Sequence, residues 1–521
     1  MKKIIMKNKY AVTAIWLLMM VLFSPGLLSQ TKDITPDEQY RPQVHFTPKE
    51  HWINDPNGMV FYKGTYHLFF QYHPYSSVWG PMHWGHTTST DMIHWKRQPI
   101  AIYPDSIGTI FSGSAVVDKN NTSGFGKKGE TPLIAMFTQH NMDGEKAGRN
   151  DYQNQSIAYS LDDGKTWKKY AGNPVLKTPG LKDFRDPKLV WYEPQKKWVV
   201  VIATRNYIDF YSSPDLKNWT KESEFGEGRG AHGGGWECPD LFPMNDNGKQ
   251  RWVLIVNLNP GAPNGGSGTQ YFVGDFDGKT FTSEQKETLW LDYGPDNYAG
   301  VTFSNTGNRK ILIGWMSNWQ YANQVPTEKF RSAMTLPREL KIKDVDNKLL
   351  ITSQPVQELA SLKSAPVTIQ NIAVNKSIDL TKKMGRLKIP CSINLSLNRA
   401  NNFSFVFSND LGEQLVVGYD QDQHQYFIDR TKSGKIDFQK DFAGRHIAPR
   451  LTDDASMNIS LVLDASSVEL FADDGLTVMT SLVFPNKPFS QIQVESSDIL
   501  SIKKITYTSL KSIWKQGAVK K

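Results

Sequence analysis

The stretch Ser89-Thr90-Asp91-Met92-Ile93-His94-Trp95 is a polar turn that carries an aspartate, follows a strand-like run and is closed by a tryptophan. Turns of the same kind recur at 160–167, 213–219 and 274–281, and their closing aromatic residues lie 72, 52 and 62 positions apart. Repeats of this size, each long enough for about four strands, are typical of the blades of a β-propeller. A β-sandwich with recurrent Asp-Gly turns would give a similar pattern, so the turns alone leave two folds open.

The first domain predicted from this pattern covers residues 40–345. Short strand-like runs are separated by clusters of Gly, Pro, Asn and Asp, and almost no long segment has the period of a helix. Four of the turns are visible, and a fifth blade fits between about Val301 and Leu340. We therefore expect an all-β protein that begins with a five-bladed β-propeller.

The composition changes after Leu340, where tryptophan becomes much rarer. Residues 356–363 are compatible with one short helix or with a linker, and we assign 346–365 to a linker. Alternating strand-like runs such as Phe403-Ser404-Phe405-Val406-Phe407 then continue through 366–515. This pattern predicts a separate C-terminal β-sandwich of packed antiparallel sheets.

The first 29 residues have the form of a cleaved secretory signal. Lys2, Lys3, Lys7 and Lys9 precede an apolar run over 11–23, which is short for a membrane span. An uncleaved anchor is the alternative. We expect an exported protein, periplasmic or secreted, that has no membrane span once the signal is removed.

The charge of the chain does not indicate a nucleic-acid partner. The formal net charge is +8, and it falls to +4 when the four signal-peptide lysines are removed. The remaining excess is spread along the chain and forms no basic stripe. The oligomeric state is not encoded in any pattern that we recognise.

Neither cysteine nor histidine predicts a metal or cofactor site. The two cysteines, Cys238 and Cys391, are far apart in the sequence and form no disulfide framework. His83 and His86 are three positions apart, but they lie in a strand-like context in which no helix places them on one face. We therefore expect no metal and no organic cofactor.

Three carboxylates stand in unusual local sequences. Asp55 lies in 51–58, HWINDPNG, and Asp186 follows Arg185; both aspartates precede a proline. Glu237 follows three glycines and Trp236, so an apolar neighbour could raise its pKa, as suits a proton donor. Hydrolysis of a glycosidic bond commonly uses two carboxyl groups, and in a propeller these would come from different blades. Taken singly, each acid is better explained by a structural role: Asp55 as a turn cap, Asp186 as half of an ion pair and Glu237 as a residue that faces water.

A set of motifs in a fixed order resembles the glycoside hydrolase family 32 of invertases, inulinases and levanases. The match covers nearly the whole mature chain, and the residues of these motifs most resemble those of the exo-acting inulinases and levanases. The motifs are His51-Trp52-Ile53-Asn54-Asp55-Pro56-Asn57-Gly58, Phe70-Gln71-Tyr72, Trp79-Gly80-Pro81-Met82-His83-Trp84-Gly85-His86, Phe111-Ser112-Gly113-Ser114, Phe184-Arg185-Asp186-Pro187, Trp236-Glu237-Cys238-Pro239-Asp240 and Gly314-Trp315-Met316-Ser317-Asn318-Trp319-Gln320-Tyr321. Ile53 stands where relatives often have methionine, which is a tolerable apolar exchange.

The resemblance implies a role for each of the three acids. Asp55 would be the nucleophile, Glu237 the general acid and then the general base, and Asp186 would hold fructose hydroxyls and stabilise the transition state. Seven further residues would line the fructosyl pocket, namely Asn54, Gln71, Trp79, Phe111, Ser112, Arg185 and Trp319. A retaining reaction of this type requires the two reacting carboxyls to lie about 5–5.5 Å apart.

The function implied by the resemblance is release of terminal fructose from levan, inulin or both, and from sucrose, through a covalent fructosyl-enzyme. An endo-acting levanase and a fructosyltransferase on the same scaffold are alternatives, because they share this intermediate. A non-catalytic fructan-binding protein and a propeller hydrolase for arabinofuranosides or xylosides are further alternatives. The sequence does not separate β-2,6 from β-2,1 linkages.

Overall fold

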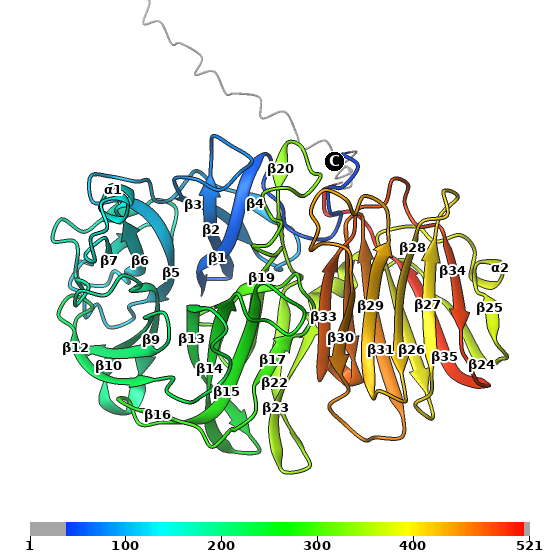
Figure 1. The fold of residues 1–521 in the computed structure, drawn as a ribbon. Helices are drawn as coiled ribbons and strands as arrows, with labels where there is room; N and C mark the ends of the chain where they lie inside the picture. Colours follow the sequence, from blue (N-terminus) through cyan, green and yellow to red (C-terminus); the bar gives the residue numbers. More distant parts are fainter. Residues whose placement is uncertain (1–37, 515–521) are drawn as a thin grey trace, which may run out of the picture. The chain divides into compact units, whose positions relative to one another are not determined.

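The computed structural model describes residues 38–514 and consists almost entirely of strands (Figure 1). The predicted signal 1–29 and residue 515, the last of the predicted sandwich, lie outside this range. The helical segments are short; they are α1 (Met142–Lys146), α2 (Thr381–Met384) and the 3-10 turns η1 (Glu193–Gln195), η2 (Gln357–Leu362) and η3 (Asp473–Gly475). Within residues 38–514, no helix combines the length and the apolar character needed to cross a bilayer.

Five antiparallel sheets form the blades of a propeller, so the predicted fold class is confirmed. Blade one contains β1 (His51–Tyr62), β2 (Thr65–His73), β3 (His83–Ser89) and β4 (Lys96–Arg97). Blade two contains β5 (Thr109–Val117), β6 (Leu133–His140), β7 (Gln153–Ser160) and β8 (Lys168–Lys169). Blade three contains β9 (Arg185–Tyr192), β10 (Lys197–Ala203), β11 (Ile208–Ser213) and β12 (Thr220–Phe225).

The last two blades carry extra short strands. Blade four contains β13 (Gly235–Asp246), β14 (Lys249–Asn259), β15 (Gly268–Phe276), β16 (Phe281–Thr282) and β17 (Leu289–Asp292). Blade five contains β18 (Tyr298–Thr302), β19 (Lys310–Met316), β21 (Ala333–Met334), β22 (Arg338–Val345) and β23 (Lys348–Pro355). The remaining strand, β20 (Phe330–Arg331), leaves the fifth blade and pairs in parallel with β1, which joins the last blade to the first.

The recurrent turns lie at equivalent places, between the third and fourth strands of blades one to four. Their aspartates hold the turns closed by accepting backbone N–H groups. Asp91 accepts from the N–H groups of Ile93 and His94 at 2.9 and 2.8 Å. Asp215 accepts from Lys217 and Asn218 at 2.9 and 2.8 Å. The aspartate of each repeat therefore satisfies backbone donors that the tight turn leaves without a strand partner.

The segment predicted as a linker, 346–365, contains β23, which pairs with β22 along its whole length. Asp346 and Asn347 both have positive φ, 52° and 65°, and they form the two-residue turn between these strands. Asp-Asn is a pair that tolerates this conformation, and such turns match the twist of a hairpin. The fifth blade therefore extends to Pro355, and only η2 and its flanks connect the two domains.

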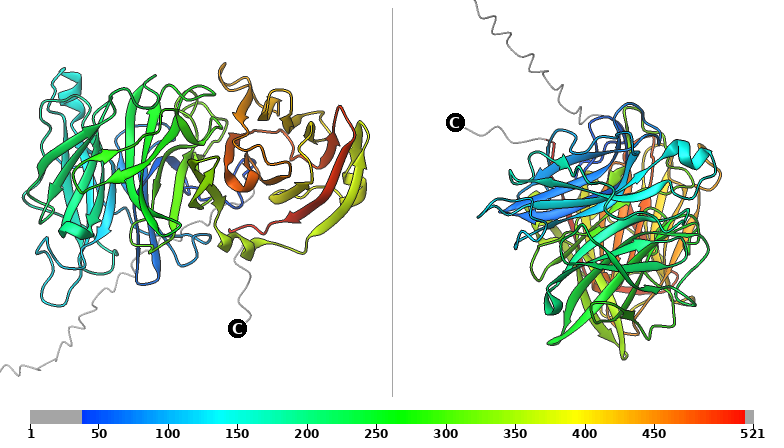
Figure 2. Two further views of the ribbon diagram at one scale, coloured as in Figure 1. Left: turned by 90° about the horizontal axis from the view of Figure 1, so that it is seen from below. Right: turned by 90° about the vertical axis from the view of Figure 1, so that its left-hand side faces the viewer.

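The C-terminal sandwich consists of two six-stranded antiparallel sheets, which face each other in the left view of Figure 2. One sheet contains β24 (Val367–Val374), β35 (Leu500–Ser509), β26 (Cys391–Leu397), β31 (Met457–Asp464), β32 (Ser467–Ala472) and β33 (Thr477–Leu482). The other contains β25 (Ser377–Asp379), β34 (Gln491–Glu495), β27 (Phe403–Ser408), β28 (Gln414–Asp420), β29 (Gln425–Lys432) and β30 (Arg445–Pro449). Alternate side chains such as Phe403, Phe405 and Phe407 are buried between the sheets.

A fully buried ionic network joins the propeller to the sandwich. The Arg338 guanidinium contacts Asp292 at 2.8 Å and Glu469 at 2.5 Å. The ring of His45 lies 3.2 Å from Glu469 and 2.7 Å from Asp464. Burial alone would lower the pKa of His45, but the two carboxylates outweigh burial and raise it to about 9. His45 is therefore a buried imidazolium at neutral pH.

Candidate active site

The innermost strand of each blade breaks its regular pairing close to the propeller axis. Register shifts fall between Ile53 and Pro56 in β1, and between Glu237 and Asp240 in β13. Similar irregularities occur in β5, β18 and the pairing of β9 with β10. A bulge bends a strand and re-aims its side chains, and such bulges are common beside active sites. Here they present polar groups from all five blades to one region.

All ten residues singled out from the sequence line one cavity of about 340 Å³. The structure brings together Asn54, Asp55, Gln71, Trp79, Phe111, Ser112, Arg185, Asp186, Glu237 and Trp319, and it leaves none of them elsewhere. They come from all five blades. The fifth blade contributes Trp319, which lies in the loop after β19. Motifs that follow one another along the chain therefore lie side by side around the cavity.

Asp55 is a buried carboxyl held by two donors from different blades. Ser112 donates its hydroxyl to Oδ2 at 2.5 Å, and the Asn54 amide donates to Oδ1 at 2.9 Å. Trp52 donates its indole N–H to the other end of the Asn54 amide at 2.7 Å, which fixes its orientation. Burial raises the pKa of Asp55, while these hydrogen bonds oppose the rise. The ionised form of Asp55 is therefore unfavourable in this buried position, and it is stabilised by the hydrogen bonds from Ser112 and Asn54.

Asp186 stands on a left-handed backbone, with φ of 62°, directly before Pro187. Its Oδ2 accepts the backbone N–H of Cys238 at 3.0 Å, and the Cys238 thiol lies 3.6 Å away. The same thiol is 3.5 Å from Asp55, so Cys238 lies between the two aspartates. Burial raises the pKa of Asp186 to about 7 in spite of the Arg185 charge. A non-glycine residue held with positive φ at such a site is strained backbone that the surrounding contacts maintain.

Glu237 is the most accessible of the three acids, with 23% of its side chain exposed. Arg185 donates to its Oε1 at 2.8 Å, and the Tyr298 hydroxyl donates to its Oε2. Arg185 is in turn held by Asp183. Each oxygen of Glu237 therefore has its own donor, and the carboxyl group has a defined orientation at the mouth of the cavity.

Aromatic side chains form the walls. Trp319 stacks on Trp52 with ring centroids 5.9 Å apart, and Trp79 meets Phe111 edge to face at 6.3 Å. The ring of His140 stacks on Phe111 at 4.3 Å. Rigid apolar faces beside a small number of fixed polar groups are characteristic of a small-molecule site.

Sequence reasoning missed several residues of the cavity. His140, Glu145, Gln153, Asp183 and Asn259 also line it. Asp183, two positions before Arg185, could have been found from its neighbour. His140 and Asn259 end second strands, Gln153 begins a third strand and Glu145 lies in α1, and no motif marks any of them. Tyr298 was also missed, although it is buried and contacts Glu237 directly.

The site is rich in carboxylates and has a single guanidinium at its centre. Arg185 carries a pKa well above its usual value, because the charges of Glu237, Asp186 and Asp183 outweigh its burial. Across residues 38–514, no group of three or more His, Cys, Asp and Glu side chains is arranged to hold a metal ion. The chemistry that these side chains themselves offer is proton transfer and attack by a carboxylate.

Both domains match one enzyme family. Residues 45–353 match the family described as "Glycosyl hydrolases family 32 N-terminal domain", and residues 358–510 match "Glycosyl hydrolases family 32 C terminal". These two matches cover the propeller and the sandwich respectively. They account for nearly all of the described chain.

Individual relatives agree with this assignment. The chain is 46% identical to a levanase of Bacillus subtilis over 491 residues, which cover 92% of this chain and 71% of the relative. It is 41% identical to an extracellular exo-inulinase of Aspergillus niger over 500 residues, which cover 86% and 90%. The fold superposes on the crystal structure of the exo-inulinase from Aspergillus awamori with a TM-score of 0.84 at 36% identity, covering 92% of this chain and 99% of that one. The motifs of that family also supply ten of the residues that line the cavity. The chain belongs to glycosyl hydrolase family 32.

Proposed function

We propose that the protein is an exo-acting, retaining fructan hydrolase, which releases terminal fructose from levan and inulin and also cleaves sucrose. The observation that carries this proposal is the meeting of Asp55, Asp186 and Glu237, from three different blades, in one cavity of about 340 Å³. The levanase and exo-inulinase relatives supply the substrate class.

In the first half of the proposed reaction, Asp55 attacks the anomeric carbon of the terminal fructose. The bond from that carbon to the leaving oxygen breaks, and Glu237 donates its proton to this oxygen. A covalent fructosyl ester of Asp55 remains. Ser112 and Asn54 hold the carboxylate of Asp55 in place through the hydrogen bonds described above.

In the second half, Glu237 removes a proton from a water molecule, and this water attacks the anomeric carbon. Fructose leaves and Asp55 is restored as a carboxylate. Glu237 suits both steps because it is partly exposed and has a fixed orientation between Arg185 and Tyr298. Asp186 would bind fructose hydroxyls and stabilise the positive charge that develops on the sugar ring.

The size of the cavity supports an exo mode. Small-molecule sites span about 300–1,000 Å³, and about 340 Å³ lies at the small end of that range. The rings of Trp79, Phe111 and Trp319 bound the space, and Trp319 is held in place by stacking on the buried Trp52. A space of this size suits one terminal sugar unit better than an internal stretch of polymer.

We further propose that the protein is exported, to the periplasm or the medium, and acts there on polymer too large to enter a cell. The sequence of the first 29 residues and the extracellular exo-inulinase relative support this location. Fractionation of the producing cells, followed by N-terminal sequencing of the recovered protein, tests the location and the cleavage together.

The deciding experiment is chromatography of the products formed from levan, inulin and sucrose in separate reactions. Fructose as the sole early product from a polymer is the expected result, with Asp55→Asn and Glu237→Gln as inactive controls. Early oligosaccharides would overturn the exo mode and indicate an endo-acting enzyme. Longer sugars built from sucrose would indicate a fructosyltransferase, and the absence of any product would indicate a binding protein.

A further inference from the structure

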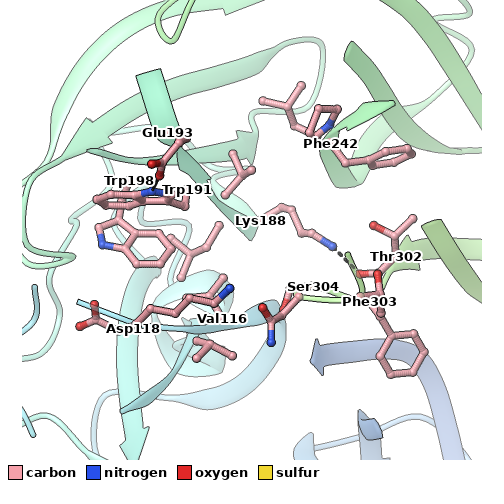
Figure 3. A pocket seen from close by; sticks show the side chains of 18 of the residues that line it. Val116, Asp118, Lys188, Trp191, Glu193, Trp198, Phe242, Thr302, Phe303 and Ser304 are labelled. Atoms are coloured by element: carbon pink, nitrogen blue, oxygen red, sulfur yellow. Dashed lines mark hydrogen bonds between the residues drawn. The ribbon is translucent and has the colours of Figure 1, made fainter. Parts of the chain in front are cut away.

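A second and larger cavity, of about 510 Å³, is formed by the other ends of the same innermost strands (Figure 3). Strand β9 contributes Arg185 to the first cavity and Lys188 and Trp191 to the second. Strand β13 contributes Glu237 to the first and Phe242 to the second. A strand rises about 3.3 Å per residue, so the two cavities are on the order of 15 Å apart along the propeller axis.

A buried ion pair lies between the two cavities. Lys188, which is only 7% exposed, donates to Asp240 at 3.0 Å and to the carbonyl of Thr302 at 2.6 Å. Asp240 also accepts the N–H and the hydroxyl of Thr302. No residue lines both cavities. The second cavity is therefore separate from the one that holds the three carboxyls.

The acids of the second cavity are already engaged. Asp118 accepts hydrogen bonds from Thr122 and Ser123 in its own loop, through both of its oxygens. Glu193 is paired with Lys196 and accepts the indole N–H of Trp191 at 2.5 Å. These carboxylates leave little acceptor capacity for the hydroxyls of a neutral sugar.

Two lysines of the cavity make no ion pair in residues 38–514, the exposed Lys119 and the partly buried Lys310. Lys310 is partly buried, and in residues 38–514 no carboxylate lies within salt-bridge distance of it; its one hydrogen bond is a long one to the carbonyl of Gly307 at 3.4 Å. Burial and the nearby charge of Lys188 lower the pKa of Lys310, although Asp240 opposes this. A partly desolvated ammonium without a counter-ion is unfavourable, and an entering anion would relieve that cost.

The apolar side of the cavity is rigid. Trp191 meets Trp198 with ring centroids 5.0 Å apart, and Glu193 and Thr122 each hold one of the two indole N–H groups. Figure 3 shows the two indoles on one side of the cavity and Phe242 and Phe303 on the other, with the Lys188 side chain between them. Fixed aromatic faces bind a flat apolar group at little entropic cost.

We propose that this end of the propeller axis is a binding site for a small organic oxyanion, a carboxylate or a phosphate monoester, with an apolar body. Lys310 pairs with the oxyanion, the free third N–H of Lys188 assists it, and the tryptophan face holds the apolar body. This site is independent of the hydrolytic reaction proposed above.

Titration calorimetry of the full-length mature protein at low ionic strength tests the proposal, with benzoate, phenyl phosphate, inorganic phosphate and neutral benzyl alcohol as probes. We expect one molecule of benzoate or phenyl phosphate to bind per chain, undisturbed by saturating fructose, and benzyl alcohol to bind at least tenfold more weakly. Whichever of benzoate and phenyl phosphate binds more tightly shows whether the site prefers a carboxylate or a phosphate monoester. Binding of inorganic phosphate as tight as that of phenyl phosphate would overturn the role of the apolar face.

Variants separate this site from other cationic surfaces. Lys310→Met should weaken binding at least tenfold and Lys310→Arg should retain it, while Lys503→Met, at an exposed lysine of the sandwich, should have no effect. Hydrolysis of sucrose should be unchanged in all three. Unchanged affinity in Lys310→Met, or no binding of any anion, would overturn the proposal.

Crystals of the unaltered protein soaked in 4-bromobenzoate provide a test that does not depend on a variant. The expected result is an anomalous bromine peak beside Trp191, with the carboxylate towards Lys310. A peak only in the carboxyl-lined cavity, or no ordered peak at all, would contradict the proposed site.

Discussion

Ser112 and Asp55 lie in different blades and share a 2.5 Å hydrogen bond from hydroxyl to carboxylate. This bond lowers the pKa of Asp55 against the rise that burial causes. Ser112→Ala should therefore raise the pKa of Asp55 further and move the acidic limb of the kcat/KM profile to higher pH, with about tenfold loss of rate near neutrality. Initial rates on sucrose across the pH range measure this shift.

The control is Ser212→Ala, because Ser212 also donates to a carboxylate, Glu222 at 2.6 Å, but on the third strand of blade three. It should leave the profile in place. An acidic limb that stays fixed in Ser112→Ala would show that the group controlling this limb is not Asp55.

Asp186→Asn should lower kcat/KM for sucrose by about 10²–10³, because the amide cannot stabilise the developing positive charge as a carboxylate does. Steady-state kinetics measure the loss. Asp209→Asn provides a matched control, since Asp209 is also a buried aspartate of the same blade but pairs with Lys221 instead. If both variants lose the same fraction of activity, the effect belongs to folding and not to the site.

Tyr298→Phe should lower kcat about tenfold or more with a smaller change in KM. The lost hydroxyl is the one donor to Oε2 of Glu237 in residues 38–514, and without it the carboxyl is free to leave its reactive orientation. Tyr211→Phe removes a comparable contact with Asp209 and should not change kcat. A rise in KM alone would place Tyr298 in ground-state binding.

His45 predicts a stability that declines in alkaline solution. Its folded pKa of about 9 lies above the unfolded value of about 6.5, so the folded state binds the proton more tightly. The contribution, about 3 kcal/mol at most, is complete below pH 6.5 and is lost as the pH rises through 9. Denaturant unfolding at several pH values measures this loss.

His45→Gln should flatten this dependence between pH 6.5 and 9 while lowering stability at pH 6. His94→Gln is the control, because His94 pairs with Asp91 on the exposed surface. If the two variants keep the same pH dependence as the parent, another group is responsible for the alkaline loss.

Much of the fold could be predicted because its signals are local. A turn that binds its own backbone through an aspartate leaves a mark within seven or eight residues, and this mark located four of the five blades. The end of the fifth blade depended on Asp346 and Asn347, two adjacent residues of positive φ, which are easily mistaken for a polar linker.

The site was predicted where the sequence constrains the backbone, and missed where it does not. Asp55 and Asp186 stand before prolines, and Glu237 follows a run of glycines. Tyr298 has no such neighbour, and its part in the cavity arises only because β18 lies next to β13 in the closed ring. Lys188 and Asp240 are likewise joined only by the tertiary structure.

The parallel pairing of β20 with β1 bears on how the protein is made. The innermost strand of blade one is synthesised early, whereas its partner at Phe330 and Arg331 is translated only after all five inner strands have emerged. Until then the start of β1, at His51 and Trp52, presents unpaired backbone groups on one side, which can associate with another nascent chain. A chain that ends before residue 331 should therefore be an aggregation-prone fragment and not a smaller enzyme, and helpers that shield exposed strand edges should matter most for the last stage of its biogenesis.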